Sequence, residues 1–371
     1  MSDVTFGTSQ LFVSKHRKFL KSCLCMFPDA YSHFDTSKLT LLFFLLSSLD
    51  VLNLLHELGD DEKQSIVDWI YSLQITTKQS ASPKRCGFRG SNVNRGADKS
   101  RCHSYESGHV TMAYSALACL VMLNDDLSRI DRLGLLASVK ACQQPDGSFQ
   151  CTPDDNENDM RFVYCAVVVS FVLQDFRAID VPKLLEYIVS SQNYDGGFGQ
   201  APGLESHGGS TYCAVASLDL MKRLRPSESG VLSERSIGRL IRWCLMKQDK
   251  GFHGRPAKPD DSCYSFWIGA TLEILKRSSL IDKQNAIEFT LSTQDPVLGG
   301  FAKYEDNLPD SLHTYLSLAG LSIFNYPGLQ SVHPSLNITR KSAARLFEIQ
   351  KLWDDCLKEM KLNGQPCCNE S

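Results

Sequence analysis

The sequence has no large excess of charge of either sign. Its 371 residues include 39 Lys and Arg and 42 Asp and Glu, so the net charge is −3 at neutral pH. Proteins that bind nucleic acid or an anionic membrane surface through their electrostatic field carry a basic excess or a basic cluster. We therefore expect no nucleic-acid partner.

A long hydrophobic run is also missing. The longest one, residues 39–49, ends at Asp50 and is about half as long as the ~20 residues that span a membrane. The first ten residues do not resemble a signal peptide. Many of the 14 cysteines, such as Cys119 and Cys165, lie in apolar helical stretches, which is typical of reduced core thiols. We expect a cytoplasmic protein that is not an integral membrane protein.

Strand-like alternation is absent too, and apolar residues recur at helical spacing almost throughout. Two opening helices are expected at residues 12–27 and 39–55, followed by a long polar loop at about residues 76–106. We expect residues 1–371 to form a single all-α domain with a flexible C-terminal tail from about residue 360.

An internal repeat of about fifty residues is the most informative pattern. In each copy a Gln precedes a glycine-containing turn that ends in Phe. Glycine permits the tight reversal of the chain, and Phe anchors the turn. The copies are Gln74 with Phe88, Gln144 with Phe149, Gln192 with Phe198, Gln248 with Phe252, and Gln294 with Phe301.

Each copy predicts two helices. The first ends near the Gln, and the second is rich in small residues and aligns on one aromatic position. That position holds Tyr114, Tyr164, Tyr212, Phe266 and Tyr315. An open solenoid is one possible arrangement of helix pairs. We favour a closed α/α barrel, because small residues such as Ala116 and Gly269 suit a crowded inner ring and closure makes the starts of the inner helices converge.

Polar residues gather at those predicted helix starts. Five positions before the aligned aromatic residue, the copies carry His109, Asp159, His207, Asp261 and Asp310. Three positions before it they carry Thr111, Arg161, Gly209, Cys263 and Leu312, and two positions before it Met112, Phe162, Ser210, Tyr264 and His313. Helix capping explains the acids. It does not explain histidine, cysteine and arginine at the same points, so the pattern predicts a functional site.

Two chemical groups can be assembled from these positions. Asp261, Cys263 and His313 form a three-ligand zinc set with an open fourth position, and zinc keeps a bound thiol as thiolate near neutral pH. Cationic and donor side chains suited to a diphosphate lie beside them in the sequence register. These are His207, Arg255, Lys258, Tyr264 and Lys303.

Several motifs together resemble the β subunits of protein prenyltransferases. The matching stretches are LESHGGS (204–210), HGRPAKP (253–259), DSCYSFW (261–267) and GGFAK (299–303). With NDMRFVYC (158–165) they are most similar to the type I geranylgeranylating members. The resemblance runs from about residue 10 to about residue 350. It implies an α/α barrel with one zinc ion that pairs with a separate helical α subunit.

The resemblance also implies roles for single residues. Asp261, Cys263 and His313 would ligate zinc, and the cationic group would hold the head of geranylgeranyl diphosphate. Lys303 stands where farnesylating members have an acid that helps to bind magnesium, so no magnesium requirement is expected. Thr40 replaces a bulky Trp of those members and would leave room for a fourth isoprene unit. Phe44 and Arg161 would line the same tunnel, and His109, Thr111 and Phe162 would lie near the last residue of the protein substrate.

The implied activity is transfer of a geranylgeranyl group to the cysteine thiolate of C-terminal CaaX proteins, such as small GTPases, with X usually Leu. Rab-directed β subunits share the zinc set, and they and the farnesyl-transferring β subunits stay as alternatives. A terpene cyclase would need an Asp-x-Asp-Asp proton donor, and Lys258 stands at its first acidic position. A toroid without catalysis, used for ligand or partner binding, is the remaining class.

Overall fold

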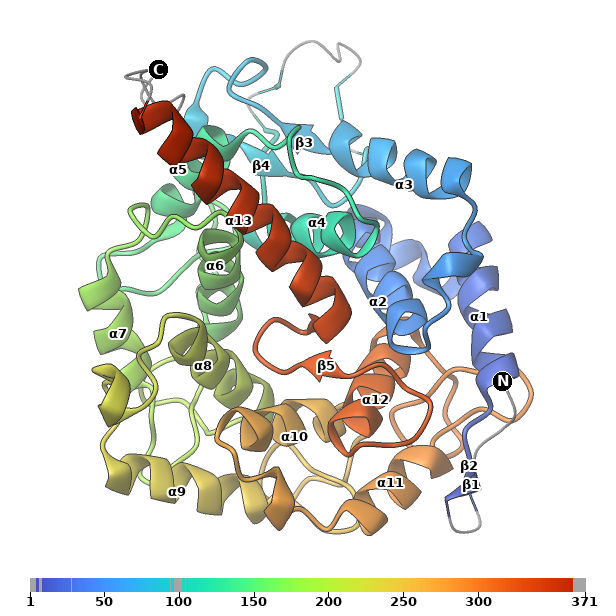
Figure 1. The fold of residues 1–371 in the computed structure, drawn as a ribbon. Helices are drawn as coiled ribbons and strands as arrows, with labels where there is room; N and C mark the ends of the chain where they lie inside the picture. Colours follow the sequence, from blue (N-terminus) through green and yellow to red (C-terminus); the bar gives the residue numbers. More distant parts are fainter. Residues whose placement is uncertain are drawn as a thin grey trace.

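The helices form two concentric rings (Figure 1). The structure, a computed structural model, describes residues 5–6, 9–27, 29–93, 95–96, 102–103 and 105–362. The inner ring consists of α2 (Lys38–Val51), α4 (Val110–Met122), α6 (Met160–Val172), α8 (Gly208–Leu220), α10 (Tyr264–Ile274) and α12 (Ser311–Ile323). Each inner helix packs against its two inner neighbours, and α12 packs against α2, so the ring is closed. The predicted α/α barrel is confirmed.

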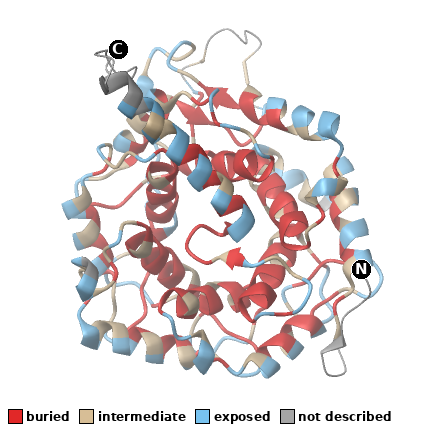
Figure 2. Ribbon diagram, in the orientation of Figure 1, coloured by how far each residue is buried: buried red, intermediate tan, exposed pale blue. Residues whose placement is uncertain are grey.

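The outer ring is made of the alternating helices of the chain. These are α1 (Val13–Cys25), α3 (Asp60–Ser72), α5 (Arg132–Cys142), α7 (Val181–Ser190), α9 (Glu234–Leu245) and α11 (Lys283–Ser292). Figure 2 shows that the inner helices are almost wholly buried, whereas the outer helices bury one side only. Helix α9, for example, buries Leu240, Trp243 and Cys244. This difference follows from the sequence, since a helix that is apolar all round must be surrounded by other elements.

The repeated turns join each outer helix to the next inner one. Gln and Phe pair across the turn as short antiparallel bridges at Gln192–Phe198, Gln248–Phe252 and Gln294–Phe301, and as strands β3 (Gln74–Ile75) and β4 (Gly87–Phe88) in the first copy. In the second copy the residue that pairs with Phe149 is Gln143, so the alignment on Gln144 was wrong by one residue. The five phenylalanines are fully buried and anchor the turns.

The last turn packs against the first helix. Gly299 has a φ of +78°, and a Cβ there would lie 2.3 Å from the carbonyl oxygen of Lys15, so only glycine fits. His16 accepts the Gly300 N–H at Nδ1 (2.8 Å), contacts Gln294 Oε1 through Nε2 (2.9 Å) and stacks on Phe301. The two ends of the repeat array are thereby joined.

One end of the barrel is covered by the C-terminal segment. Strands β5 (Val332–His333) and β6 (Ile338–Thr339) form a hairpin, and α13 (Arg340–Leu362) follows it and crosses the ring in Figure 1. Asp50, at the end of α2, accepts hydrogen bonds from the hydroxyls of Thr339 (2.6 Å) and Ser342 (2.7 Å). The segment is therefore fixed to the inner ring at the point where α13 begins.

The remaining described segments are short. Strands β1 (Thr5–Phe6) and β2 (Ser9–Gln10) pair with each other, and the long polar stretch contains a helical turn at Pro83–Arg85 before β4. Residues 363–371, which hold most of the predicted tail, lie outside the described residues. Among the helices that the structure describes, we find none with the length and apolar composition to cross a membrane.

Candidate active site

The starts of the inner helices share one capping arrangement. In α4, α6, α8 and α12 the side chain of the preceding residue accepts a hydrogen bond from a backbone N–H of the first turn. The pairs are His109 with Thr111 (3.1 Å), Asp159 with Arg161 (2.7 Å), His207 with Gly209 (3.0 Å) and Asp310 with His313 (2.8 Å). The predicted register is therefore real, and it brings these side chains to the same end of the barrel.

The start of α10 departs from that arrangement. Asp261 Oδ1 accepts a hydrogen bond from the Cys263 N–H (3.0 Å). Cys263 itself is the residue just before the helix, and its side chain makes no capping hydrogen bond. Ser262 donates to the carbonyl of Ala302 (2.6 Å) and so ties this irregular turn to the next repeat. Cys263 therefore stands at the start of α10 without capping it through its side chain.

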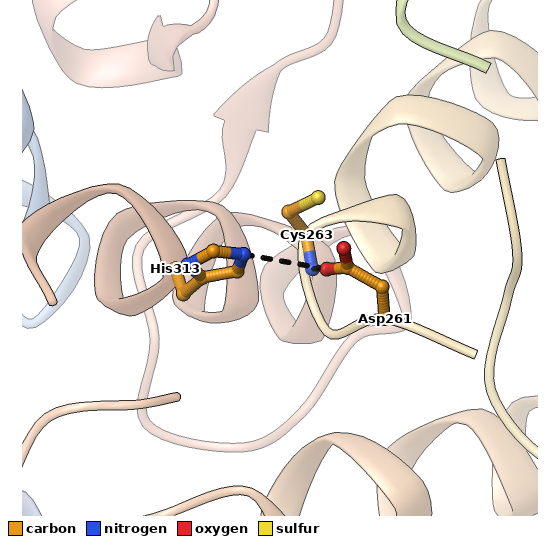
Figure 3. Close-up of side chains that lie close together, drawn as sticks. All are labelled: Asp261, Cys263 and His313. Atoms are coloured by element: carbon orange, nitrogen blue, oxygen red, sulfur yellow. Dashed lines mark hydrogen bonds and ion pairs between the residues drawn. The ribbon is translucent and has the colours of Figure 1, made fainter. Parts of the chain in front are cut away.

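Asp261, Cys263 and His313 come together as the sequence predicted. Figure 3 shows the three side chains converging, with His313 reaching from α12 toward the pair before α10. Their nearest ligand atoms all lie within 4.8 Å of one another, and His313 Nε2 is 3.4 Å from Asp261 Oδ1. Asp261 and Cys263 are buried. Donor atoms of oxygen, sulfur and nitrogen held this close match the ligand types of zinc.

The electrostatics of this trio also fit a divalent ion. Burial lowers the pKa of His313, but hydrogen bonds to Asp261 and Asp310 outweigh it and raise the pKa to about 9. Burial, and then the charge of Asp261, raises the pKa of the Cys263 thiol. A bound metal ion would displace one proton from the Cys263 thiol and one from the His313 imidazolium, because it stabilises thiolate and neutral imidazole directly.

Asp310 orients the imidazole from behind. Its Oδ2 lies 2.6 Å from His313 Nδ1, which leaves Nε2 directed at Asp261. Metal-binding histidines usually have such a carboxylate behind them. Sequence reasoning placed Asp310 in the ring of helix starts without this role. The three-residue spacing to His313 was the signal that was available.

A second group of possible ligands lies in the loop before α10. Asp249, His253 and Asp260 also bring one ligand atom each within 4.8 Å. Asp260 already accepts the N–H of Gly251 (2.8 Å) and contacts His253 Nδ1 (3.4 Å), and the Asp249 side chain is 77 % exposed. This group holds the turn in shape and lacks the buried thiol of the first trio.

The predicted diphosphate group is assembled around Tyr264. Its hydroxyl lies 2.9 Å from His207 Nε2. Its ring packs so closely on Gly254 that a Cβ at that glycine would lie only 2.0 Å from Tyr264 Cζ. His207 Nδ1 accepts a backbone N–H, so the neutral ring carries its proton on Nε2. Burial, and then the charge of Arg255, lowers the pKa of His207, which keeps the ring neutral.

The cations of this group come from the loop before α10 and from the next Gly-Phe turn. Arg255 is half-buried and contacts Glu205 at 3.4 Å, and Lys258 is exposed on the same loop. Lys303 Nζ lies 3.7 Å from Asp261 Oδ2 and therefore beside the candidate metal centre. Lys303 is thus the cation beside the carboxylate–thiol pair, whereas Arg255 lies near enough to His207 and Tyr264 for its charge to act on the pKa of both.

Two of the three predicted prenyl-lining residues lie together on α2. Thr40 Oγ1 contacts Met112 Sδ (3.4 Å). Phe44 packs on Tyr315, and their ring centroids are 6.2 Å apart. Arg161 is different. It forms ion pairs with Asp159 and Glu157 and lies over the ring of Phe162, with its side chain 54 % exposed. The structure therefore places Arg161 at the polar edge beside the predicted peptide residues.

The predicted peptide residues sit at the starts of α4 and α6. The rings of His109 and Phe162 meet edge to face at 6.0 Å, and Thr111 contacts Cys165. Burial lowers the pKa of His109 to about 4, so its imidazole is neutral. His109 also lines a cavity of about 690 Å³ between the long polar loop and the starts of α2 and α4. The buried ion pair of Arg89 and Glu106 lines it as well, and no sequence spacing pointed to this cavity.

Comparison with known proteins identifies the family. The model of the prenyltransferase alpha-alpha toroid domain matches residues 11–338. The chain belongs to this family. A geranylgeranyl transferase type-1 subunit beta from Dictyostelium discoideum is 38 % identical over 345 residues, which cover 89 % of this chain and 96 % of the relative. The subunit of the same name from Arabidopsis thaliana is 36 % identical over 335 residues, which cover 87 % of this chain and 88 % of the relative.

A solved structure agrees with these relatives. Candida albicans protein geranylgeranyltransferase-I complexed with GGPP aligns with a TM-score of 0.82 at 26 % identity, over 91 % of this chain and 99 % of the other. Within the prenyltransferase family the chain therefore belongs with the type-1 geranylgeranyl transferase β subunits, and it is an enzyme subunit of the geranylgeranyl-transferring kind. The family predicted from the sequence motifs is confirmed.

Proposed function

We propose that this chain is the catalytic β subunit of a heterodimeric, zinc-dependent, cytoplasmic protein geranylgeranyltransferase that modifies C-terminal CaaX proteins. The observation that carries the proposal is the trio of buried Asp261, buried Cys263 and half-buried His313, with the donor group of His207 and Tyr264 beside it. A member of a prenyl-transferring family needs both parts, one to activate a thiol and one to hold a diphosphate.

The trio fits zinc better than magnesium. Zinc takes oxygen, sulfur and nitrogen ligands in a four-coordinate set, whereas magnesium prefers six oxygens. Three protein ligands leave one position for the substrate sulfur. Bound there, zinc would lower the pKa of the acceptor thiol so that thiolate is present at neutral pH. Lys303 lies near Asp261 and supplies positive charge, which supports a reaction without magnesium.

The residues of this chain then act on the diphosphate. The acceptor thiolate attacks C1 of geranylgeranyl diphosphate, a carbon–sulfur bond forms, the C1–oxygen bond breaks, and its electron pair leaves with the diphosphate. Arg255, Lys258 and Lys303 hold the departing negative charge. The Tyr264 hydroxyl, which accepts the Nε2 proton of the neutral His207, donates its own proton in a hydrogen bond to the diphosphate. No covalent intermediate with the protein is required.

Prenyl length and peptide choice are proposed to depend on different residues of neighbouring inner helices. Thr40 and Phe44 on α2 would face the isoprenoid, and the small Thr40 leaves room for the fourth unit. His109, Thr111 and Phe162 would contact the last residue of the peptide, and Arg161, which lies over the Phe162 ring, would line the prenyl tunnel beside them.

The partner is proposed to be the α subunit of the farnesyl- and geranylgeranyltransferase type I pair. Large apolar side chains are exposed on the loops that lead to the inner helix starts, among them Tyr194 (93 %), Leu204 (50 %), Val297 (83 %) and Leu308 (79 %). Such residues at one rim are typical of a protein interface.

The test is a transfer assay with the purified heterodimer. C15 and C20 diphosphates are offered with peptides that end in Leu, in Ser or in paired cysteines. We expect C20 transfer to the Leu-ending peptide to be fastest, and Thr40→Trp to shift the preference toward C15. Preference of the wild-type complex for C15, or for paired cysteines, would assign the chain to another prenyltransferase class.

A further inference from the structure

An aromatic side chain lies within the first two turns of every inner helix. Each inner helix contributes one buried side chain, and we call the set the annulus: Phe43, Tyr114, Tyr164, Tyr212, Phe266 and Tyr315. Neighbouring rings are 5.0–5.6 Å apart between centroids along the series from Tyr315 through Phe43 to Phe266. These distances are in the favourable range for aromatic pairs.

The tyrosine hydroxyls of the annulus bind one short loop. Tyr164 donates to the carbonyl of Ser335 (3.1 Å) and Tyr212 to that of Pro334 (2.9 Å). Tyr315 donates to the carbonyl of Asn337 (2.7 Å). Residues 334–337, which join β5 to β6, therefore occupy the centre of the annulus, and we call them the plug.

Asn337 makes the most contacts within the plug. It is buried and has a φ of +55°, a conformation that asparagine tolerates better than most residues. Its side chain donates to the Tyr114 hydroxyl (3.2 Å) and lies 2.9 Å from the Tyr315 hydroxyl. One side chain thus links two helices of the annulus to the loop.

The plug cannot move freely, because its flanking residues are held as well. Thr339, two residues after Asn337, bonds to Asp50 on α2, and Ser335 bonds to Asp219 on α8 (2.5 Å). Burial of the tyrosines raises the pKa of their hydroxyls, so the donors stay protonated. Annulus and plug together form a rigid wall across the barrel.

Accessible apolar side chains border this wall. Phe44 is half-buried and packs on Tyr315, and the half-buried Trp267 packs on Tyr212 at 5.1 Å. Both come from inner helices, and Phe44 is a proposed prenyl-lining residue. An apolar chain that lies against Phe44 and Trp267 would meet the annulus next.

We propose that Asn337 and the four tyrosine hydroxyls are positioning residues that set the depth available to the prenyl chain. The inference rests on the proposed geranylgeranyl transfer. It adds a second determinant of the prenyl length that the enzyme accepts, besides the small side chain of Thr40. Removal of the Asn337 side chain breaks two buried contacts and opens space at the wall, so a longer chain is accommodated.

The test compares C15, C20 and C25 all-trans diphosphates with the heterodimer that carries Asn337→Gly. Glycine accepts the positive φ and removes only the side chain. We expect the C25/C20 ratio of kcat/KM to rise on the order of tenfold. Tyr315→Phe keeps the ring, removes one hydroxyl and should raise the ratio by a smaller factor. Asn325→Gly is the matched control, since Asn325 is an exposed asparagine with a φ of +64°.

The outcomes separate the two proposals. The inference is overturned if the C25/C20 ratio is unchanged in both Asn337→Gly and Tyr315→Phe. A lowered thermal stability in either variant would then mean that the plug is only structural. If Asn337→Gly does not fold, Tyr315→Phe decides. Absence of transfer with every chain length in the wild-type complex would instead contradict the proposed function.

Discussion

At the starts of the inner helices the repeats carry different residues, and within the next two helical turns they carry nearly the same one. The helix starts hold His109, Asp159, His207, Asp261 and Asp310, and their neighbours include Arg161, Cys263 and His313. The annulus holds tyrosine or phenylalanine in every inner helix. The residues that repeat therefore form the frame of the barrel. The residues that differ between repeats, at the helix starts, form the candidate active site.

The same contrast is seen in the electrostatics. At the helix starts, opposing shifts raise the pKa of His313 to about 9 and lower that of His109 to about 4, although both are histidines at equivalent ends of the ring. Two carboxylates surround His313, whereas desolvation dominates at His109. In the annulus, burial acts alike on every tyrosine. Changes at the helix starts should therefore alter activity in residue-specific ways.

Cys263→Ala should give the largest effect. It removes one of three ligands, so transfer should fall by more than the ~10–100-fold that is typical of losing an outer-shell partner. Zinc content of the heterodimer and the transfer rate are the measurements. Cys213→Ala is the control, because Cys213 is a buried thiol of the same inner ring in α8. Equal zinc loss in both variants would contradict the assignment.

Asp310→Asn should come next. The amide still caps α12 but no longer supplies charge behind His313, so zinc affinity should fall by about 10–100-fold. Competition with a chelator measures it. Asp282→Asn, which changes a similar cap on the outer helix α11, should leave zinc affinity unchanged. An effect of Asp282→Asn as large as that of Asp310→Asn would show that capping alone is responsible.

Arg255→Gln should have a smaller effect that is confined to the diphosphate. Loss of one charge-assisted contact should raise KM for the prenyl diphosphate by about tenfold and leave zinc content as it is. Arg17→Gln, at an exposed ion pair with Glu57, should change neither quantity. A lower zinc content in Arg255→Gln would mean that the cations and the metal centre are not separate parts.

The smallest effect on activity is expected from a change in the frame. Burial lowers the pKa of His16 to about 4, against about 6.5 in an unfolded chain. The unfolded state thus binds more protons, so the free energy of unfolding should decline as the pH falls from about 6.5 to 4, by at most about 3 kcal/mol from this residue. His16→Gln should flatten the decline in denaturant titrations, whereas His56→Gln, at an exposed histidine, should not. An unchanged slope in His16→Gln would contradict this account.

Much of the frame could be predicted from the sequence because the repeat carries it. The Gln–Phe turns and the aligned aromatic residues defined helix pairs, and their common register placed His313 beside Asp261 although fifty-two residues separate them. The sixth inner helix, α2, was recognised as a buried helix but was not aligned with the others, since no Gln–Phe turn precedes it.

What could not be predicted depends on contacts outside the repeat. The binding of residues 334–337 to the tyrosine hydroxyls follows from the path of the C-terminal segment, which has no counterpart in the other copies. The buried pair of Arg89 and Glu106 depends on the fold of the long polar loop. Arg161 is assigned to the prenyl tunnel by resemblance, and its ion pairs with Asp159 and Glu157 are contacts that the repeat does not predict.

The most direct test of the central claim is a zinc titration of the chelated heterodimer while geranylgeranyl transfer to a Leu-ending CaaX peptide is followed. The account predicts that chelation abolishes transfer and that activity returns in proportion to zinc, with a plateau at one zinc per heterodimer and no need for magnesium. Full transfer after chelation, or recovery with magnesium in the absence of zinc, would contradict it.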